Sequence, residues 1–316
     1  MSEKKGGPLV VVGGVTASGK TALGIRLCGR FLGEVISADS MQIYQGMEIA
    51  TAAPTGEERA AATHHLVGFL SPSEPFSVAD WTALARPLIA RLQKEGKLPV
   101  VVGGTGLYLS ALMDNLDFEG FSGDPALRER LERRAQQEGG EALYGELCRV
   151  DPALAKKLHP HNLGRVIRAL EVYEATGEAM SVHQQRARER GACYRICLLA
   201  LGYADREQMR RRIDQRIERM VENGLIEEAR RFYQAYPGRT AAAAIGYKEL
   251  LPYLRGEEPL EESVARLKIR TYQYAKRQLT WLKRDSRCRW LMADQLSPQA
   301  LFERACALIE ESGILE

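Results

Sequence analysis

The run GGVTASGKT at residues 13–21 is the strongest structural signal in this chain. From Gly14 to Thr21 it matches G-x-x-x-x-G-K-[ST], a pattern in which backbone N–H groups converge on phosphate oxygens at the start of a helix. The apolar run PLVVVGG at 8–14 precedes it as a predicted buried strand, and KTALGIRLCGRFL at 20–32 follows with apolar residues at helical spacing. With both flanks present, the run predicts a phosphate-binding loop; the alternative is a tight turn without a ligand.

Two residues at the end of this loop carry most of its expected chemistry. Lys20 is expected to bridge phosphate oxygens, and the Thr21 hydroxyl is expected to ligate Mg²⁺. The whole loop is expected to surround the phosphate group, through Gly14, Val15, Thr16, Ala17, Ser18, Gly19, Lys20 and Thr21.

Asp39 comes shortly after a second predicted strand, EVIS at 34–37. Because the ends of adjacent parallel strands face one crevice, Asp39 is expected to lie across from the phosphate loop. There it suits the general base of a nucleoside or small-molecule kinase, which is the default function of such a loop. A residue that caps a turn is the alternative.

Short apolar strands alternate with helices through much of the chain, which predicts a parallel α/β sheet with right-handed crossovers. The further predicted strands are LPVVVGGTG at 98–106, YRICLLALGY at 194–203 and CRWLM at 288–292. Helices are predicted at 77–96, 205–235 and 259–284, with another at the C-terminus.

The composition of the chain is different from about residue 119 to residue 194. This segment is rich in charged residues, has helical patterns and shows no pattern of a buried strand. We interpret 119–194 as an all-helical insertion domain and residues 1–118 with 195–316 as the α/β core. The net charge is only +3, but arginines concentrate at 204–219 and basic residues at 266–289. Such local concentrations indicate a surface for an anionic partner.

Neither a signal peptide nor a membrane-spanning run is expected, and the six scattered cysteines are expected to be reduced. These features are typical of a cytoplasmic protein.

Several strings then occur in a fixed order: GGVTASGKTALGIRL, EVISADSMQIYQGMEIATAAPT, HHLVGF, FSVADW, GKLPVVVGGTGLYLSAL, NLGRVIRALEVYEATG and AKRQLTWLKRD. Together they resemble the bacterial tRNA dimethylallyltransferases, also called tRNA isopentenyltransferases, over almost the whole chain. The resemblance is most specific in DSMQIYQGMEIAT, GGTGLY and KRQLTWLKR. These three strings are not expected in a kinase.

The resemblance implies a P-loop NTPase-like fold and transfer of a dimethylallyl group from dimethylallyl diphosphate. The implied acceptor is the exocyclic amine of adenosine at tRNA position 37, beside the anticodon, and diphosphate is released. By this resemblance the loop, from Thr16 to Thr21, holds the diphosphate of the donor without turnover of ATP.

The resemblance also assigns roles to individual residues. Asp39 is the implied base, while Lys20, Thr21 with Mg²⁺, and Arg216 neutralise the diphosphate; Arg216 is favoured over its helical neighbour Arg212. The residues implied to contact tRNA are Asp39, Ser40, Met41, Gln42, Thr105, Arg128, Arg165 and Arg168. For the arginines the alternative to ligand contact is a structural role, either on a solvated helix face or as salt-bridge partners.

Two other features favour a structural role. His64 and His65 are adjacent and have no acidic or cysteine partner at metal-ligand spacing. Trp281 is expected to pack in the core near the basic face, and stacking on a base is the alternative.

The sequence departs from the family pattern at a few positions. Val15 stands where proline is common, and little functional effect is expected. Ala50 and Ala53 stand where glycine and lysine are frequent, which puts donor affinity in question. Three other functions stay open: a small-molecule kinase, a prenyltransferase acting on free adenine nucleotides, and a non-catalytic RNA-binding protein. A monomer is expected.

Overall fold

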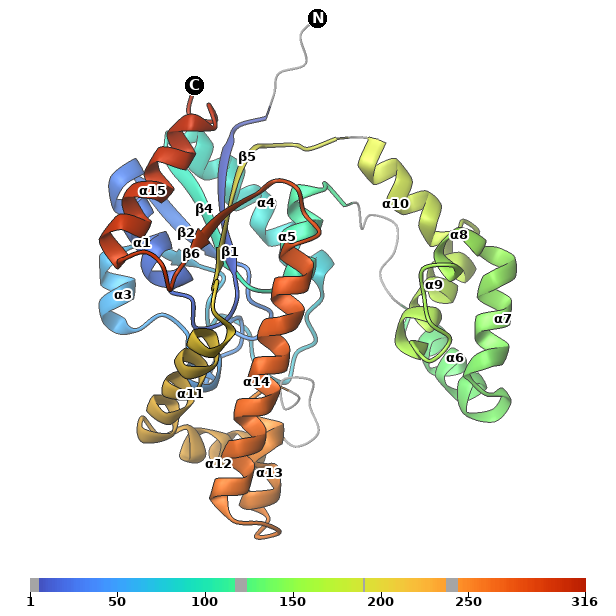
Figure 1. Cartoon of the computed structure of the whole chain (residues 1–316). Helices are drawn as coiled ribbons and strands as arrows, with labels where there is room; N and C mark the ends of the chain where they lie inside the picture. Colours follow the sequence, from blue (N-terminus) through green and yellow to red (C-terminus); the bar gives the residue numbers. More distant parts are fainter. Residues whose placement is uncertain (1–5, 117–123, 190, 237–243) are drawn as a thin grey trace, which may run out of the picture. The chain divides into compact units, whose positions relative to one another are not determined.

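The structure is a computed structural model that describes residues 6–116, 124–189, 191–236 and 244–316. The chain divides into two compact units (Figure 1). The first comprises Met1–Ser110 with Tyr194–Glu316, and the second comprises Ala111–Cys193. The boundary expected between residues 118 and 119 lies outside the described residues.

A parallel sheet of six strands forms the centre of the first unit, in the order β3-β2-β4-β1-β5-β6. The strands are β1 (Pro8–Gly14), β2 (Gly33–Ser37), β3 (His64–His65), β4 (Leu98–Gly103), β5 (Arg195–Gly202) and β6 (Cys288–Met292). The predicted strands are therefore present. The sequence did not indicate β3, because two residues are too few to show an alternating pattern.

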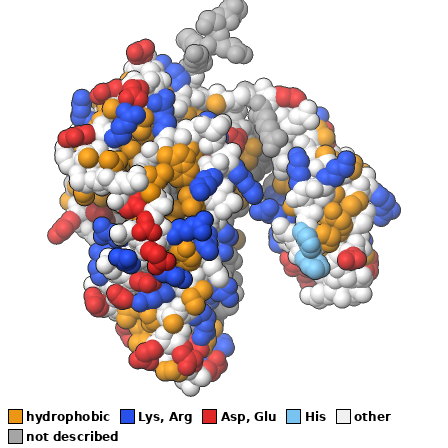
Figure 2. Space-filling model, in the orientation of Figure 1, with side chains coloured by type: hydrophobic (Ala, Val, Ile, Leu, Met, Phe, Trp, Pro, Cys, Tyr) orange, Lys and Arg blue, Asp and Glu red, His pale blue; other side chains and the backbone are white. Residues whose placement is uncertain are grey.

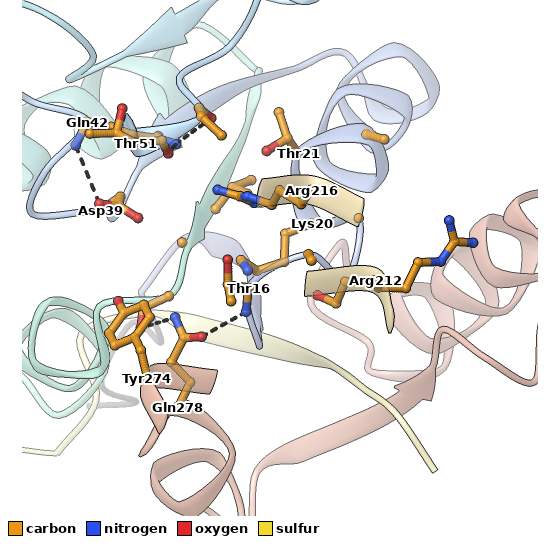
Figure 3. A pocket seen from close by; sticks show the side chains of 18 of the residues that line it. Thr16, Lys20, Thr21, Asp39, Gln42, Thr51, Arg212, Arg216, Tyr274 and Gln278 are labelled. Carbon is orange, nitrogen blue, oxygen red and sulfur yellow. Dashed lines mark hydrogen bonds between the residues drawn. The ribbon is translucent and has the colours of Figure 1, made fainter. Parts of the chain in front are cut away.

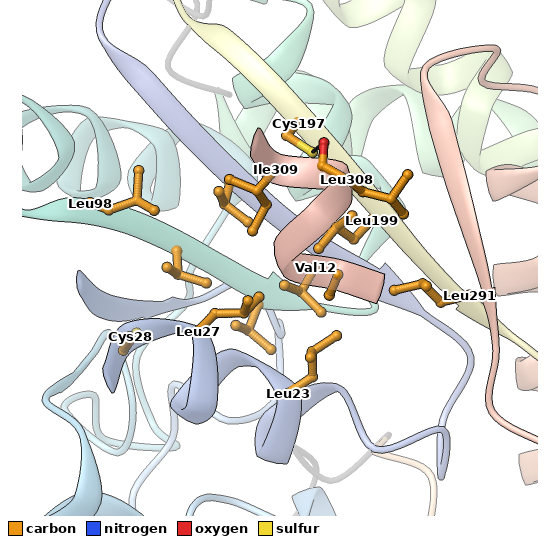
Figure 4. Packing of buried hydrophobic residues seen from close by; sticks show 14 of the residues in the cluster. Val12, Leu23, Leu27, Cys28, Leu98, Cys197, Leu199, Leu291, Leu308 and Ile309 are labelled. Atoms are coloured by element: carbon orange, nitrogen blue, oxygen red, sulfur yellow. Dashed lines mark hydrogen bonds between the residues drawn. The ribbon is translucent and has the colours of Figure 1, made fainter. Parts of the chain in front are cut away.

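Helices cover both faces of this sheet, so the central strands β1, β4 and β5 are buried along almost their whole length. One face carries α1 (Lys20–Phe31) and α15 (Pro298–Glu311), whose Leu27 and Ile309 pack into one buried cluster (Figure 4). The other face carries α4 (Val78–Lys94), α5 (Gly106–Met113) and α14 (Leu260–Leu282).

The remaining helices of the first unit are α2 (Glu48–Thr51), α3 (Gly56–Ala61), α11 (Arg206–Glu222), α12 (Leu225–Ala235) and α13 (Tyr247–Leu254). The single helix predicted over 205–235 is wrong. Gly224 has φ 97°, in the left-handed region that a helix cannot contain, so the chain turns there and α12 starts afresh. The sequence analysis also missed α13.

The described residues of the second unit form helices joined by turns, without a strand. It contains α6 (Pro125–Glu138), α7 (Gly140–Val150), α8 (Pro152–Ala155), α9 (Leu163–Thr176) and α10 (Met180–Glu189). Leu131, Leu143, Leu147 and Leu170 are fully buried in its own core. Its α6 begins at an Asp124 cap followed by proline, a combination that favours a helix start.

Among the described residues, the structure contains no helix of the length and apolarity required to cross a bilayer. All six cysteines are free thiols.

A buried carboxylate fastens the short helix α2 to α12. Glu228 is only 5% exposed, and its Oε2 and Oε1 accept hydrogen bonds from the backbone N–H groups of Ile49 (2.7 Å) and Ala50 (2.8 Å). The Tyr247 hydroxyl donates to the same Oε1 at 3.0 Å. Since the segment after β2 ends in α2, this carboxylate fixes the far end of a segment that lines the site described below.

We expect Glu228→Ala to lower the free energy of unfolding by about 3 kcal/mol, because it leaves buried donors without an acceptor. Urea denaturation followed by tryptophan fluorescence measures this, since all three tryptophans lie in the first unit. The exposed neighbour gives the control: Glu227→Ala should change the value by less than about 0.5 kcal/mol. Equal effects of the two substitutions would contradict the assigned role of Glu228.

Candidate active site

The loop between β1 and α1 is shaped to receive an anion. Ala17 and Gly19 have φ 64° and 87°, so alternate residues are left-handed and successive N–H groups turn to one side. The Ser18 hydroxyl donates to the Val15 carbonyl at 2.8 Å, and the Tyr203 hydroxyl donates to the Ala17 carbonyl at 2.6 Å. The start of α1 adds its positive dipole end. These contacts hold the loop in its curled form.

A cavity of about 370 Å³ opens in front of this loop (Figure 3). The loop residues Thr16–Thr21 form one wall. The other lining residues include Asp39, Gln42, Thr51, Glu58, Gly104, Arg212, Arg216, Arg219, Tyr274 and Gln278. Cations thus outnumber carboxylates in the wall, which suits a multiply charged anion.

The sequence analysis took the strand before Asp39 to be adjacent to the strand before the loop. This was wrong, but Asp39 reaches the cavity all the same. The strand β2 is not the neighbour of β1, because β4 lies between them. Asp39 Oδ1 accepts hydrogen bonds from the N–H groups of Met41 (2.9 Å) and Gln42 (3.4 Å), so Asp39 does cap a turn. Its Oδ2 accepts no hydrogen bond from the described residues. One carboxylate oxygen therefore shapes the turn and the other is available to a ligand.

Lys20 is half-buried, and its Nζ donates to the Val15 carbonyl at 2.7 Å. Its pKa is lowered to about 7, mainly by burial and also by the positive charge of Arg216, while the charge of Asp39 opposes the shift. The amine is therefore poised to gain a proton when an anion enters.

Arg216 and Arg212 are neighbours on α11 but lie differently. Arg216 is half-buried and points into the cavity beside Lys20, whereas Arg212 is exposed and its guanidinium points away (Figure 3). Burial lowers the pKa of Arg216, and the charge of Asp39 opposes this. Of the two, Arg216 is therefore the arginine whose guanidinium faces the cavity, and its role in anion binding stays a prediction.

A second cavity of about 320 Å³ adjoins the first. The two share five lining residues, namely Thr16, Asp39, Thr51, Arg216 and Tyr274. The rest of its wall is largely apolar, with Met41, Ala50, Ile217, Met220, Ala244, Ile245 and Leu267, and its polar members include Ser40, Lys248, Thr271 and Arg277. An anionic compartment thus meets a compartment suited to a flat, mostly apolar group, and Asp39 lies where they meet.

The residues predicted to contact the target nucleotide come together around the same junction. Ser40 and Met41 line the second cavity and Gln42 lines the first. The Thr105 hydroxyl accepts a hydrogen bond from the Ser40 N–H at 3.0 Å. The Gln42 amide donates to the carbonyl of Ala52 at 3.0 Å, which ties the segment to the end of α2.

Sequence reasoning missed two residues of α14 that line the site, Tyr274 and Gln278. Burial raises the pKa of the Tyr274 hydroxyl, and the charge of Asp39 raises it further, so the hydroxyl stays protonated. The available signal was their spacing of four residues, which places two polar side chains on one helix face. Trp281 is half-buried and donates to the Ser110 hydroxyl at 3.2 Å, so it packs against α5.

The three other predicted tRNA-contacting arginines belong to the helical unit. Arg128 pairs with Glu132 at 3.0 Å, and both Arg128 and Arg168 approach the buried Glu171, at 3.7 and 3.4 Å. Arg165 is exposed and forms no ion pair within the described part of the chain. Arg128 and Arg168 therefore have acidic partners within the unit, Arg165 has none among the described residues, and contact of the three arginines with tRNA stays a prediction.

The adjacent histidines form β3 at the edge of the sheet. His65 Nε2 lies 2.6 Å from Glu34 Oε2, and His64 Nδ1 lies 2.7 Å from the Ala62 carbonyl. Both contacts secure the edge strand.

The described residues contain no cluster of three or more His, Cys, Asp or Glu that could hold a metal ion by itself. Mg²⁺ does not require such a cluster, because it often takes few ligands from protein and the rest from phosphate and water. The Thr21 hydroxyl lines the first cavity, with the Asp39 and Glu58 carboxylates in the same wall. These hard oxygen donors fit Mg²⁺ bound together with a phosphate ligand.

Basic side chains also gather along α14 and the turn after it (Figure 2). Those that are exposed and form no ion pair among the described residues are Arg270, Lys276, Arg277, Lys283 and Arg284. We call these five residues the basic face of α14.

The parallel sheet, the phosphate loop at the end of β1 and the cations across from it define a P-loop-type α/β protein. The model of the IPP transferase family matches residues 42–285. A tRNA dimethylallyltransferase from Carboxydothermus hydrogenoformans is 42% identical over 315 residues, which cover 99% of each chain. The chain belongs to the IPP transferase family.

Solved structures agree with this assignment. A full-length tRNA isopentenylpyrophosphate transferase from Bacillus halodurans is 38% identical, with a TM-score of 0.71 and 98% of each chain covered. A eukaryotic dimethylallyltransferase described as acting on tRNA is 30% identical, with a TM-score of 0.83, covering 95% of this chain and 78% of the other. The predicted family, fold class and enzyme class are thereby confirmed.

The lowered pKa of Lys20 predicts proton uptake on anion binding. At pH 8 the free amine is mostly neutral because its pKa is about 7. Diphosphate favours the ammonium form and raises that pKa, so binding takes up a proton. Calorimetry with inorganic diphosphate, in buffers of different ionisation enthalpy, should show about one proton more for the wild type than for Lys20→Met.

The difference in proton uptake between the wild type and Lys20→Met should vanish at pH 6, where Lys20 is already protonated before the ligand binds. Equal proton uptake by the two proteins at pH 8 would argue against the lowered pKa of Lys20. The comparison between variants cancels the protons that diphosphate itself exchanges.

Proposed function

We propose that this chain transfers a dimethylallyl group from dimethylallyl diphosphate to the exocyclic amine of adenosine at tRNA position 37, next to the anticodon, and releases diphosphate. One observation carries the proposal: an anion-binding cavity and a mostly apolar cavity meet at Asp39. The names of the similar proteins, which are tRNA dimethylallyltransferases, support the same reaction.

On the donor side, the loop N–H groups, Lys20 and Arg216 bind the diphosphate. Negative charge grows on that diphosphate as the allylic C–O bond breaks, and donors already aimed at it stabilise the transition state. Mg²⁺, held by Thr21 and phosphate oxygens, would supply additional positive charge there. The mostly apolar second cavity shields the dimethylallyl group from water.

On the acceptor side, the target base must leave the anticodon loop and enter a pocket. The second cavity receives it, and its amine then faces the junction. Asp39 accepts a proton from this amine, and its Oδ2 is the free oxygen for that role. The diphosphate of the donor thus lies in the first cavity and the target base in the second, and their reacting groups meet at the junction.

The RNA backbone requires cations outside the pocket. Lys248 and Arg277 line the second cavity, and the basic face of α14 continues from Arg277. The helical unit, through Arg165 and its neighbours Arg128 and Arg168, supplies further contacts to tRNA. We propose that the enzyme works in the cytoplasm as a monomer.

Asp39→Asn should lower kcat by about 10²- to 10⁴-fold, because an amide cannot accept the proton. Mass analysis of nucleosides from treated tRNA measures the product. Diphosphate affinity should stay the same or rise, since a negative charge near the anion is removed. Retention of wild-type kcat in the variant would rule out Asp39 as the base.

Substrate choice separates the alternatives in the same assay. Wild-type protein is incubated with dimethylallyl diphosphate, Mg²⁺ and either tRNA or AMP, and with ATP in a parallel reaction. Product on tRNA alone supports the proposal, product on AMP indicates a free-nucleotide prenyltransferase, and ATP consumption without prenyl transfer indicates a kinase.

Salt should weaken tRNA binding far more than diphosphate-donor binding. Each phosphate contacted by a basic side chain releases counterions, so the logarithm of tRNA affinity should fall linearly with that of salt concentration. Lys276→Ala and Arg284→Ala, on the basic face of α14, should each make the slope shallower. Fluorescence anisotropy with an anticodon stem-loop measures it, and a slope near zero would contradict the proposed RNA surface.

A further inference from the structure

Gln278 of α14 is a buried amide that joins two loops of the site. It is 6% exposed. Its Oε1 accepts a hydrogen bond from the Thr16 N–H at 2.8 Å, and its Nε2 donates to the Gly104 carbonyl at 3.0 Å (Figure 3). The first partner belongs to the phosphate loop after β1, and the second belongs to the turn after β4. One side chain therefore holds the ends of two neighbouring strands.

The connection continues toward the acceptor side of the site. The side chains of Gln278 and Thr105 lie close to the Tyr274 hydroxyl, where they act to lower its pKa. The Thr105 hydroxyl accepts from the Ser40 N–H at 3.0 Å and donates to the Ser40 hydroxyl at 3.4 Å. A continuous chain of polar groups thus runs from the phosphate loop to the residue that follows Asp39.

We propose that Gln278 is a positioning residue that sets the distance between the diphosphate loop and the segment carrying Asp39. The inference rests on the proposed function, because it concerns how donor and acceptor are aligned. An error of about 1 Å in such an alignment can cost about 10²-fold in rate. Gln278 also lines the first cavity, but both polar atoms of its amide are engaged by the loop and the turn, so we assign it a role through the backbone that it holds.

The chemistry of the two partners matches an amide at this position. A backbone N–H needs an acceptor and a backbone carbonyl needs a donor, and the Gln278 amide offers one of each on separate atoms. Ionised glutamate offers acceptors alone, and methionine offers neither strong group. Replacement therefore leaves buried backbone groups unpaired.

The turn after β4 is built to admit this amide. A Cβ on Gly104 would lie 2.1 Å from the Nε2 of Gln278, which is closer than any real contact. A side chain on residue 104 would push the amide out of its place. Gly104→Ala therefore disturbs the same contact from the other side.

The test compares Gln278→Met and Gln278→Glu with a matched control. Gln273→Met is the control, because Gln273 lies on the same helix, is exposed and only accepts from Arg270 at 3.1 Å. Three quantities are measured: hydrogen exchange of the Thr16 amide, affinity for inorganic diphosphate, and kcat and KM for prenyl transfer to tRNA.

Gln278→Met should speed exchange of the Thr16 amide at least about tenfold, weaken diphosphate binding about tenfold and lower kcat about ten- to hundredfold. Gln278→Glu keeps the acceptor for Thr16 but loses the donor to Gly104. Its Thr16 amide should therefore stay protected while its kcat still falls. The control should match the wild type in all three measurements.

A Gln278→Met protein that folds and keeps wild-type kcat and diphosphate affinity overturns the inference. If that variant does not fold, Gly104→Ala decides: an unchanged kcat in it overturns the inference, and a fall of about tenfold or more supports it. Failure of the proposed function is distinguishable, because wild-type protein would then yield no prenylated tRNA. In that case the exchange and diphosphate measurements still decide whether Gln278 holds the loop.

Discussion

The site depends on two cations, Lys20 and Arg216, that face one half-buried cavity. With no anion between them they repel each other, and burial adds to the cost of their charges. The pKa of Lys20 is lowered to about 7 for these reasons, and Asp39 offsets only part of the effect. The negative charge of an entering diphosphate compensates the two positive charges. The fold therefore provides a site that is electrostatically unfavourable when empty and favourable when the ligand is bound.

The sheet sets the spacing on which this balance rests. The phosphate loop follows β1 and Asp39 follows β2, and β4 lies between the two strands. Two strand spacings amount to about 10 Å. β4 ends at Gly103 and the turn after it begins at Gly104, so neither residue adds a side chain of its own, and the Gln278 amide packs against Gly104. The two cavities beside these strand ends leave room for a diphosphate, a short allylic group and an approaching amine.

The parts of this arrangement that follow local rules were predictable from the sequence. The strand–loop–helix unit at Gly14–Thr21 has a motif of its own, and each long strand is a continuous apolar run. The partners of Gln278 were not predictable, because Thr16 lies 262 residues away in the sequence and no periodicity encodes such a contact. The break at Gly224 was missed because a glycine within a helical pattern does not always end the helix.

The lowered pKa of Lys20 has a consequence for covalent chemistry. Near neutral pH a large share of this amine carries a free electron pair, unlike ordinary lysines, whose pKa is about 10.5. Acylating reagents and aldehydes should therefore attack Lys20 ahead of the surface lysines. Because a bound anion would return the proton and block the approach, the rate of such labelling reports on whether the cavity is filled.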